Sequence, residues 1–133
     1  MENYPATGKS AIGLDANLAA ALGYPIGILG LISFFIDKEN KFVRFHGIQS
    51  VLYSVALGVL FFVIWIVLGI LAVILSQVSG ALAAVIGILY ILLFLVFAVI
   101  WFGGLLYSGY RAYQGQTFKL PLVGNFAEKI VEK

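Results

Sequence analysis

Two long stretches without charged residues dominate the pattern of polar and hydrophobic positions along the chain. Residues 16–36 and residues 47–110 contain no Asp, Glu, Lys or Arg, over 21 and 64 positions respectively. A helix needs about 20 predominantly apolar residues to cross the hydrocarbon core of a bilayer. The first stretch therefore accommodates one membrane span, and the second accommodates two.

The predicted fold is an all-α integral membrane protein with three transmembrane helices, at about residues 16–36, 46–75 and 81–113. Asp15 is suited to cap the first helix, because its carboxylate can accept free backbone N–H groups. Pro25 lies inside that helix, where its missing N–H and its ring predict a kink. The turn-like cluster Ser76-Gln77-Val78-Ser79-Gly80 predicts a hairpin between the second and third helices.

The two ends of the chain are more polar than the middle. Residues 1–15 form a polar N-terminal segment, residues 16–113 the three-helix membrane domain and residues 114–133 a tail. In the tail, Leu122, Phe126 and Ile130 fall on one face of a helix, with polar residues elsewhere. This pattern predicts a short amphipathic helix on the cytoplasmic membrane surface.

Composition supports a membrane protein and excludes several other classes. Hydrophobic residues make up 62% of the chain and charged residues 11%, against roughly 45–50% and 25% in soluble domains. The chain has no cysteine, so it has neither disulfides nor thiolate metal sites. Its net charge of +2 is too small to indicate nucleic acid binding. The expected partner is the lipid bilayer.

Basic residues near the ends of the spans predict the orientation, because cytoplasmic loops carry an excess of Lys and Arg. Lys38, Lys41 and Arg44 follow the first predicted span, and Arg111 and Lys119 follow the third. The other side has only Lys9. We therefore expect a multi-pass plasma membrane protein with its N-terminus outside and its C-terminus in the cytoplasm.

A stripe of polar residues follows one face of the second predicted helix. His46, Gln49, Ser50, Tyr53 and Ser54 repeat at i, i+3, i+4, i+7 and i+8. Polar groups at membrane depth need partners, so the stripe should face the helix bundle or a wet cavity. Three interpretations stay open: helix packing, a polar groove open to the cytoplasm, or a metal or proton site at His46. The full set of candidate residues is Arg44, His46, Gln49, Ser50, Tyr53, Ser54, Ser108 and Arg111; we expect Arg111 to snorkel or to donate to Gln49 or Tyr53.

Glycines mark a second pattern, because small residues let membrane helices approach closely. The candidates for helix packing are Gly23, Gly27 and Gly30 in the first helix, Gly58 in the second, and Gly87 and Gly104 in the third. They indicate packing within one chain or an interface between copies in a homo-oligomer.

Catalytic arrangements are absent from the sequence. Every acidic residue lies in a predicted loop or terminus, so no carboxylate pair lies within a span. Ser50 and Ser54 near His46 lack an orienting acid. One histidine without neighbouring carboxylates or cysteines is a poor metal site. We therefore expect no enzyme activity, no metal and no cofactor.

Three blocks of sequence carry a resemblance: Gly13-Leu14-Asp15-Ala16-Asn17, the stretch from Lys38 to Ser50 with Val43-Arg44-Phe45-His46, and Lys119-Leu120-Pro121-Leu122-Val123-Gly124. They resemble a family of small, uncharacterised prokaryotic membrane proteins. That family is distantly similar to the channel-forming Tic-twenty subunit of the chloroplast inner-envelope translocon.

The resemblance implies that the chain assists polypeptide translocation or insertion, as an oligomer or with other translocon subunits. Arg44, His46, Gln49, Tyr53 and Arg111 would then receive the polypeptide. Two alternatives stay open. One is a non-catalytic membrane scaffold or interaction protein, and the other is a small-solute or ion permease.

Overall fold

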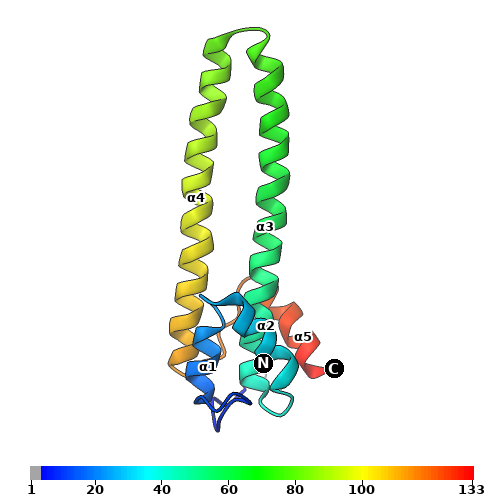
Figure 1. The fold of residues 1–133 in the computed structure, drawn as a ribbon, viewed down its shortest axis with the longest axis vertical. Coiled ribbons are helices and arrows are strands. Elements are labelled where there is room, and N and C mark those ends of the chain that lie inside the picture. Colours follow the sequence, from blue (N-terminus) through cyan, green and yellow to red (C-terminus); the bar gives the residue numbers. More distant parts are fainter. Residues whose placement is uncertain (1–3) are drawn as a thin grey trace. The chain divides into compact units, whose positions relative to one another are not determined.

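The computed structural model describes residues 4–133, and within this range it is all helical, as the sequence predicts. The described residues form five α-helices and no extended strand (Figure 1). The helices are α1 (Ala16–Leu22), α2 (Gly27–Ile36), α3 (Lys41–Ser76), α4 (Gly80–Tyr113) and α5 (Val123–Glu132).

Two short helices, α1 and α2, replace the single kinked helix predicted over residues 16–36. Pro25 has no N–H to continue the helical ladder, and Ile26 leaves the helical region with φ −113° and ψ 80°. The chain turns at this break, since a Cβ on Gly23 would lie 3.1 Å from the Cα of Gly30.

This break changes how many helices of the protein are long enough to span a membrane. A helix of 10 residues, the length of α2, is about 15 Å long, against a hydrocarbon core of about 30 Å. Among residues 4–133, only α3 and α4 are long and apolar enough to cross a membrane. The first predicted span, over residues 16–36, is therefore not seen as one membrane-crossing helix.

The long helix α3 begins earlier than its predicted start near residue 46. The side chain of Asn40 accepts a hydrogen bond from the N–H of Val43 at 3.3 Å, and its carbonyl accepts one from Arg44 at 3.1 Å. Asn40 therefore caps the helix, and residues 41–44, which lie between the first and second predicted spans, form the first turn of α3.

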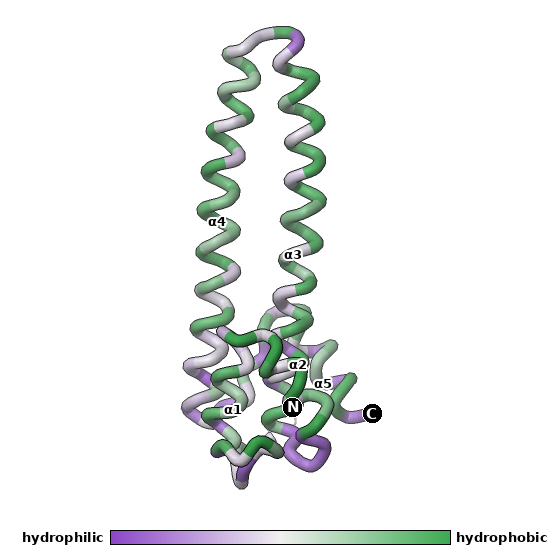
Figure 2. The backbone as a smooth tube through the Cα atoms, viewed as in Figure 1, coloured by the Kyte–Doolittle hydropathy of each residue, from purple (hydrophilic) through white to green (hydrophobic). Residues whose placement is uncertain are grey.

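The contacts divide the chain into two compact units. The first, here called the polar unit, comprises residues 4–54 and 103–133. The second, here called the apolar hairpin, comprises residues 55–102, so α3 and α4 contribute to both units. All 14 charged residues of the sequence lie outside the apolar hairpin. Figure 2 shows the consequence, with hydrophilic colour concentrated in the loops and termini.

Within the apolar hairpin, aromatic side chains join the two helices. Phe61 of α3 stacks on Phe97 of α4 with ring centroids 4.1 Å apart, and the Trp65 and Tyr90 rings meet edge to face at 5.3 Å. The hydroxyl of Tyr90 also donates to the carbonyl of Trp65 at 2.5 Å. Most other large side chains of the hairpin are exposed, as expected for helices that have lipid as their solvent.

Candidate functional site: a buried polar network

A chain of hydrogen bonds runs through the polar unit and begins at Tyr24, in the break between α1 and α2. The Tyr24 hydroxyl lies 2.7 Å from Nδ1 of His46 and accepts a hydrogen bond from Nε2 of Gln49 at 2.6 Å. On the other side of the imidazole, Nε2 of His46 lies 3.1 Å from the carbonyl of Gln116.

These contacts fix where the protons lie. The carbonyl of Gln116 can only accept, so Nε2 of His46 carries the proton and donates it to that carbonyl. Nδ1 of His46 then accepts from the Tyr24 hydroxyl. Burial raises the pKa of the Tyr24 phenol above its ordinary value, so the hydroxyl keeps the proton that it donates. His46 is therefore a neutral hydrogen-bonding group in this arrangement.

Gln49 extends the network to the connection between α4 and α5. Its Nε2 donates to the carbonyl of Phe118 at 2.9 Å, and its Oε1 accepts from the N–H of Leu120 at 3.0 Å. One side chain thus satisfies two backbone groups of a segment about 70 residues further along the chain. Gly124 packs against the same side chain, since a Cβ at this position would lie 2.8 Å from Oε1 of Gln49.

The network is sealed from solvent. His46 and Gln49 are both 0% exposed. The rings of Phe42 and Phe45 lie edge-on to the imidazole, with centroid distances of 4.6 and 5.1 Å. Buried polar groups cost free energy unless they are paired, and here each side chain finds its partners inside the polar unit.

Close backbone contact joins α2 to α3 beside the network. A Cβ on Gly30 would lie 2.5 Å from Oγ of Ser50, and a Cβ on Gly47 would overlap the carbonyl oxygen of Gly30. The hydroxyl of Ser50 donates to the carbonyl of Gly47 at 2.8 Å. Ser50 and the two glycines therefore allow α2 and α3 to cross at close range.

The other glycines predicted for packing differ in their surroundings. Gly104 lies under the ring and hydroxyl of Tyr53, and Gly58 lies 3.8 Å from the ring of Trp101 as measured from an added Cβ. Gly27 and Gly87 have open space where a side chain would point.

The two arginines among the predicted site residues interact within the polar unit. Arg44 donates from Nε to the carbonyl of Phe34 at 3.2 Å and lies over the Phe34 ring. Arg111 donates to the hydroxyl of Tyr107, one turn earlier on the same helix, at 3.1 Å.

Two serines of the predicted site residues remain. Ser108 is fully buried and its hydroxyl has no hydrogen-bond partner, whereas Ser54 is half-buried. Ser108 thus lies in the interior of the polar unit without belonging to the network.

Sequence reasoning missed the network's other partners. Tyr24 lies within an apolar stretch, beside Pro25, and its position there was a signal that could have been used. The carbonyls of Gln116 and Phe118 and the N–H of Leu120 are backbone groups, which carry no sequence signal. Gly47 was also missed, although it lies within the polar stripe.

The N-terminal segment contacts the segment that follows α4. The N–H of Tyr4 donates to Oγ1 of Thr117 at 3.1 Å, and that hydroxyl donates to the carbonyl of Tyr4, also at 3.1 Å. Ends of a chain that bond to each other lie on the same side of a membrane. The prediction of an outside N-terminus with a cytoplasmic C-terminus is not confirmed, and the contact between Tyr4 and Thr117 favours both ends on one side.

The tail forms a helix as predicted, with its small residues facing inward. Gly124, Ala127 and Val131 of α5 are buried, whereas Leu122 and Phe126 are 80% and 63% exposed. Leu122 has a positive φ of 64°, and the N–H of Val123 donates across it to the carbonyl of Pro121 at 2.7 Å. This is a γ-turn in its strained form, at a residue that carries a side chain.

Comparison with known proteins gives the family. The model of the magnetosome magnetite crystal formation protein family matches residues 10–127. The chain belongs to this family. No solved structure matches it.

Relatives of this family member are named as membrane proteins. A UPF0132 membrane protein of Methanocaldococcus jannaschii is 33% identical over 123 residues, covering 92% of this chain and 94% of the relative. One from Archaeoglobus fulgidus is 32% identical over 118 residues, covering 87% and 95%. A second from Methanocaldococcus jannaschii is 30% identical over 120 residues, covering 90% and 72%. The predicted resemblance to a small, uncharacterised prokaryotic membrane family is confirmed; these comparisons give no support for the more distant likeness to Tic-twenty.

Proposed function

We propose that this protein is a non-catalytic membrane scaffold. The apolar hairpin anchors it in the lipid bilayer, and the polar unit presents a folded surface to other proteins, with further copies of the chain as the first candidate partners. The observation that carries the proposal is the buried network of Tyr24, His46 and Gln49, whose polar groups bond to one another and to backbone groups of the same unit.

The network supports a role of these polar residues in helix packing and argues against a groove that conducts polar segments. A groove that receives polar segments needs polar groups that face water and can exchange partners. His46, Gln49 and Ser50 instead bond to Gln116, Phe118, Leu120 and Gly47, and none of the three side chains is exposed. Opening such a site to water would exchange several of these hydrogen bonds for bonds to water, at a net cost of about 0.5–1.5 kcal/mol each.

The charge distribution supports a cytoplasmic polar unit. All eight Lys and Arg residues lie in it, and the turn between α3 and α4, residues 77–79, has none. Because basic residues stay on the cytoplasmic side, both termini would face the cytoplasm of the plasma membrane. The exposed side chains of Leu122 and Phe126 would then rest in the lipid interface.

A thiol-accessibility experiment tests the scaffold proposal, and the lack of native cysteine makes it clean. Ser108→Cys changes a fully buried side chain with little change in volume. In inverted vesicles, a membrane-impermeant maleimide should leave this cysteine unlabelled and should label the matched control Lys38→Cys at an exposed position. Rapid labelling of Ser108→Cys would support a water-filled groove and overturn the proposal.

Translocation is the competing function, and a photo-crosslinker at Ser54 distinguishes the two. Ser54 is the half-buried member of the predicted stripe. The scaffold proposal predicts crosslinks only to copies of the chain or to stable partners. Capture of nascent polypeptides would support the Tic-twenty-like function instead, and solute or ion flux through reconstituted vesicles would support a permease.

The family description favours a second candidate, participation in magnetite crystal formation. A membrane scaffold could serve such a process by organising the proteins around a crystal. The test is to replace a family member with this chain in a magnetosome-forming cell. Restored crystals would support this candidate, and crystals no different from those of the deletion strain would contradict it.

A further inference from the structure

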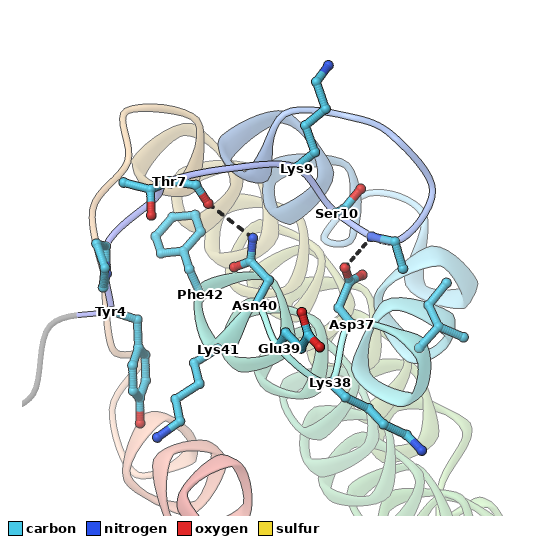
Figure 3. A pocket seen from close by; sticks show the side chains of 13 residues that line it. Tyr4, Thr7, Lys9, Ser10, Asp37, Lys38, Glu39, Asn40, Lys41 and Phe42 are labelled. Carbon is cyan, nitrogen blue, oxygen red and sulfur yellow. Dashed lines mark hydrogen bonds between the residues drawn. The ribbon is translucent and has the colours of Figure 1, made fainter.

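A cleft of about 710 Å³ lies in the polar unit, and its lining includes none of Tyr24, His46 and Gln49. The N-terminal segment from Tyr4 to Ala11 forms one wall, and the connection between α2 and α3 with the first residues of α3 forms the other (Figure 3). Its volume falls within the range of roughly 300–1,000 Å³ that is usual for sites that bind small molecules.

Two buried polar atoms at this cleft have no partner. Asp37 is 3% exposed; its Oδ1 accepts from the N–H of Ala11 at 2.5 Å, but its Oδ2 has no hydrogen bond. Ser10 is 5% exposed, and its hydroxyl is also unpartnered. Both residues line the cleft. A buried carboxylate oxygen without a donor is costly, so these atoms favour a ligand that supplies donors.

The charged side chains around the cleft are arranged by sign. Figure 3 shows the carboxylates of Asp37 and Glu39 and the hydroxyl of Ser10 near the middle of the group. In the same view the amines of Lys9, Lys38 and Lys41 point outward. Lys9 pairs with Asp15 at 3.6 Å. The middle of the cleft therefore offers oxygen acceptors and negative charge.

We propose that this cleft binds a primary ammonium group. An ammonium has three N–H donors, which match Oδ2 of Asp37, the hydroxyl of Ser10 and the carboxylate of Glu39. A metal ion is a poorer match, because residues 4–133 contain no group of three or more His, Cys, Asp or Glu side chains that could hold one. The amine belongs either to a phosphatidylethanolamine head group or to a small soluble amine.

A fluorescence titration tests the site. Lys38→Cys, labelled with an environment-sensitive dye, reports from the rim of the cleft, and nanodiscs of phosphatidylcholine supply no primary amine. Added ethanolamine should give a saturable change. Asp37→Asn should weaken the apparent affinity for ethanolamine at least tenfold, and Ser10→Ala should weaken it about threefold. Glu128→Gln, whose partner Lys119 also lies outside the cleft, is the matched control and should leave the titration unchanged.

Two arms separate the sources of the amine. If the lipid head group is the ligand, nanodiscs that contain phosphatidylethanolamine should show the dye signal before any addition and should lose most of the response to soluble ethanolamine. If the ligand is soluble, the two lipid compositions should titrate alike. Either result supports the ammonium site.

Three outcomes would overturn it. The first is no saturable response to either source of amine. The second is a response that Asp37→Asn and Ser10→Ala leave unchanged while they alter thermal stability, since the two side chains would then have only a structural role. The third is a response to Mg²⁺ or Ca²⁺ but not to amines. The scaffold proposal does not depend on any of these results.

Discussion

Helix α3 is held in two different ways in the two units. In the apolar hairpin, α3 and α4 meet through aromatic rings such as Phe61 and Phe97, and large side chains face outward. In the polar unit, α3 is fixed by hydrogen bonds to backbone groups and by the glycine contact with α2. Hydrogen bonds depend on direction, so they tolerate little change in the geometry of the polar unit. The apolar side-chain contacts of the hairpin can adjust to such a change. Specific structure should therefore be concentrated in the polar unit.

The largest expected effect comes from Gln49→Leu. The carbonyl of Phe118 and the N–H of Leu120 would lose their partner while staying buried. We expect a loss of about 4 kcal/mol in the free energy of unfolding, from two unpaired groups at about 1–3 kcal/mol each. Denaturation with SDS in lipid bicelles measures it. The exposed Gln77→Leu is the control and should change stability by less than about 0.5 kcal/mol.

The next effect is steric. Gly47→Ala places a methyl group on the carbonyl of Gly30, between two backbones that cannot yield like a flexible side chain. We expect destabilisation by about 3 kcal/mol, as for overpacked sites. Gly87→Ala is the matched change in the apolar hairpin, where the added methyl meets nothing. Equal stability of the two variants would contradict the distinction between the units.

A change of opposite sign is expected at the γ-turn. Leu122→Gly removes the strain of a positive φ at a residue with a Cβ. The free energy of unfolding should rise by about 1 kcal/mol in the same assay. Leu122→Ala keeps the strain and removes the exposed side chain. If both variants gained equally, the cause would be the lost side chain instead of the backbone.

The smallest effect belongs to the apolar hairpin. Tyr90→Phe removes the hydrogen bond to the carbonyl of Trp65 and keeps the ring contact. Hydrogen bonds between membrane helices average about 0.6 kcal/mol, so the loss should be of that size. A loss comparable to that of Gln49→Leu would mean that the hairpin depends on directional bonds as strongly as the polar unit does.

Some of this architecture follows from the sequence and some does not. The uncharged run over residues 47–110 predicts the hairpin, since its length and apolarity leave few other folds. The polar stripe at His46 and Gln49 places its members on one face. Hydropathy alone does not separate a kinked span from two short helices joined at Pro25, because both have the same composition.

Only the side chains of the site could be predicted from the sequence; their partners could not. Side chains such as His46 carry a pattern, but their partners are the backbone groups of Gln116, Phe118 and Leu120, and any residue supplies those. The contact between Gly30 and Gly47 depends on how two separate helices cross. Such long-range contacts arise from the fold and leave no local mark.

The most direct test of the account concerns which segments face the cytoplasm. Single cysteines at Lys9, Ser79 and Lys129 are treated with an impermeant maleimide in intact cells, and again after permeabilisation. Two crossings with a cytoplasmic polar unit predict labelling from outside only at Ser79, in the turn between α3 and α4, with Lys9 and Lys129 labelled after permeabilisation. Labelling from outside at Lys9, with Lys129 protected, would indicate three crossings and contradict the account.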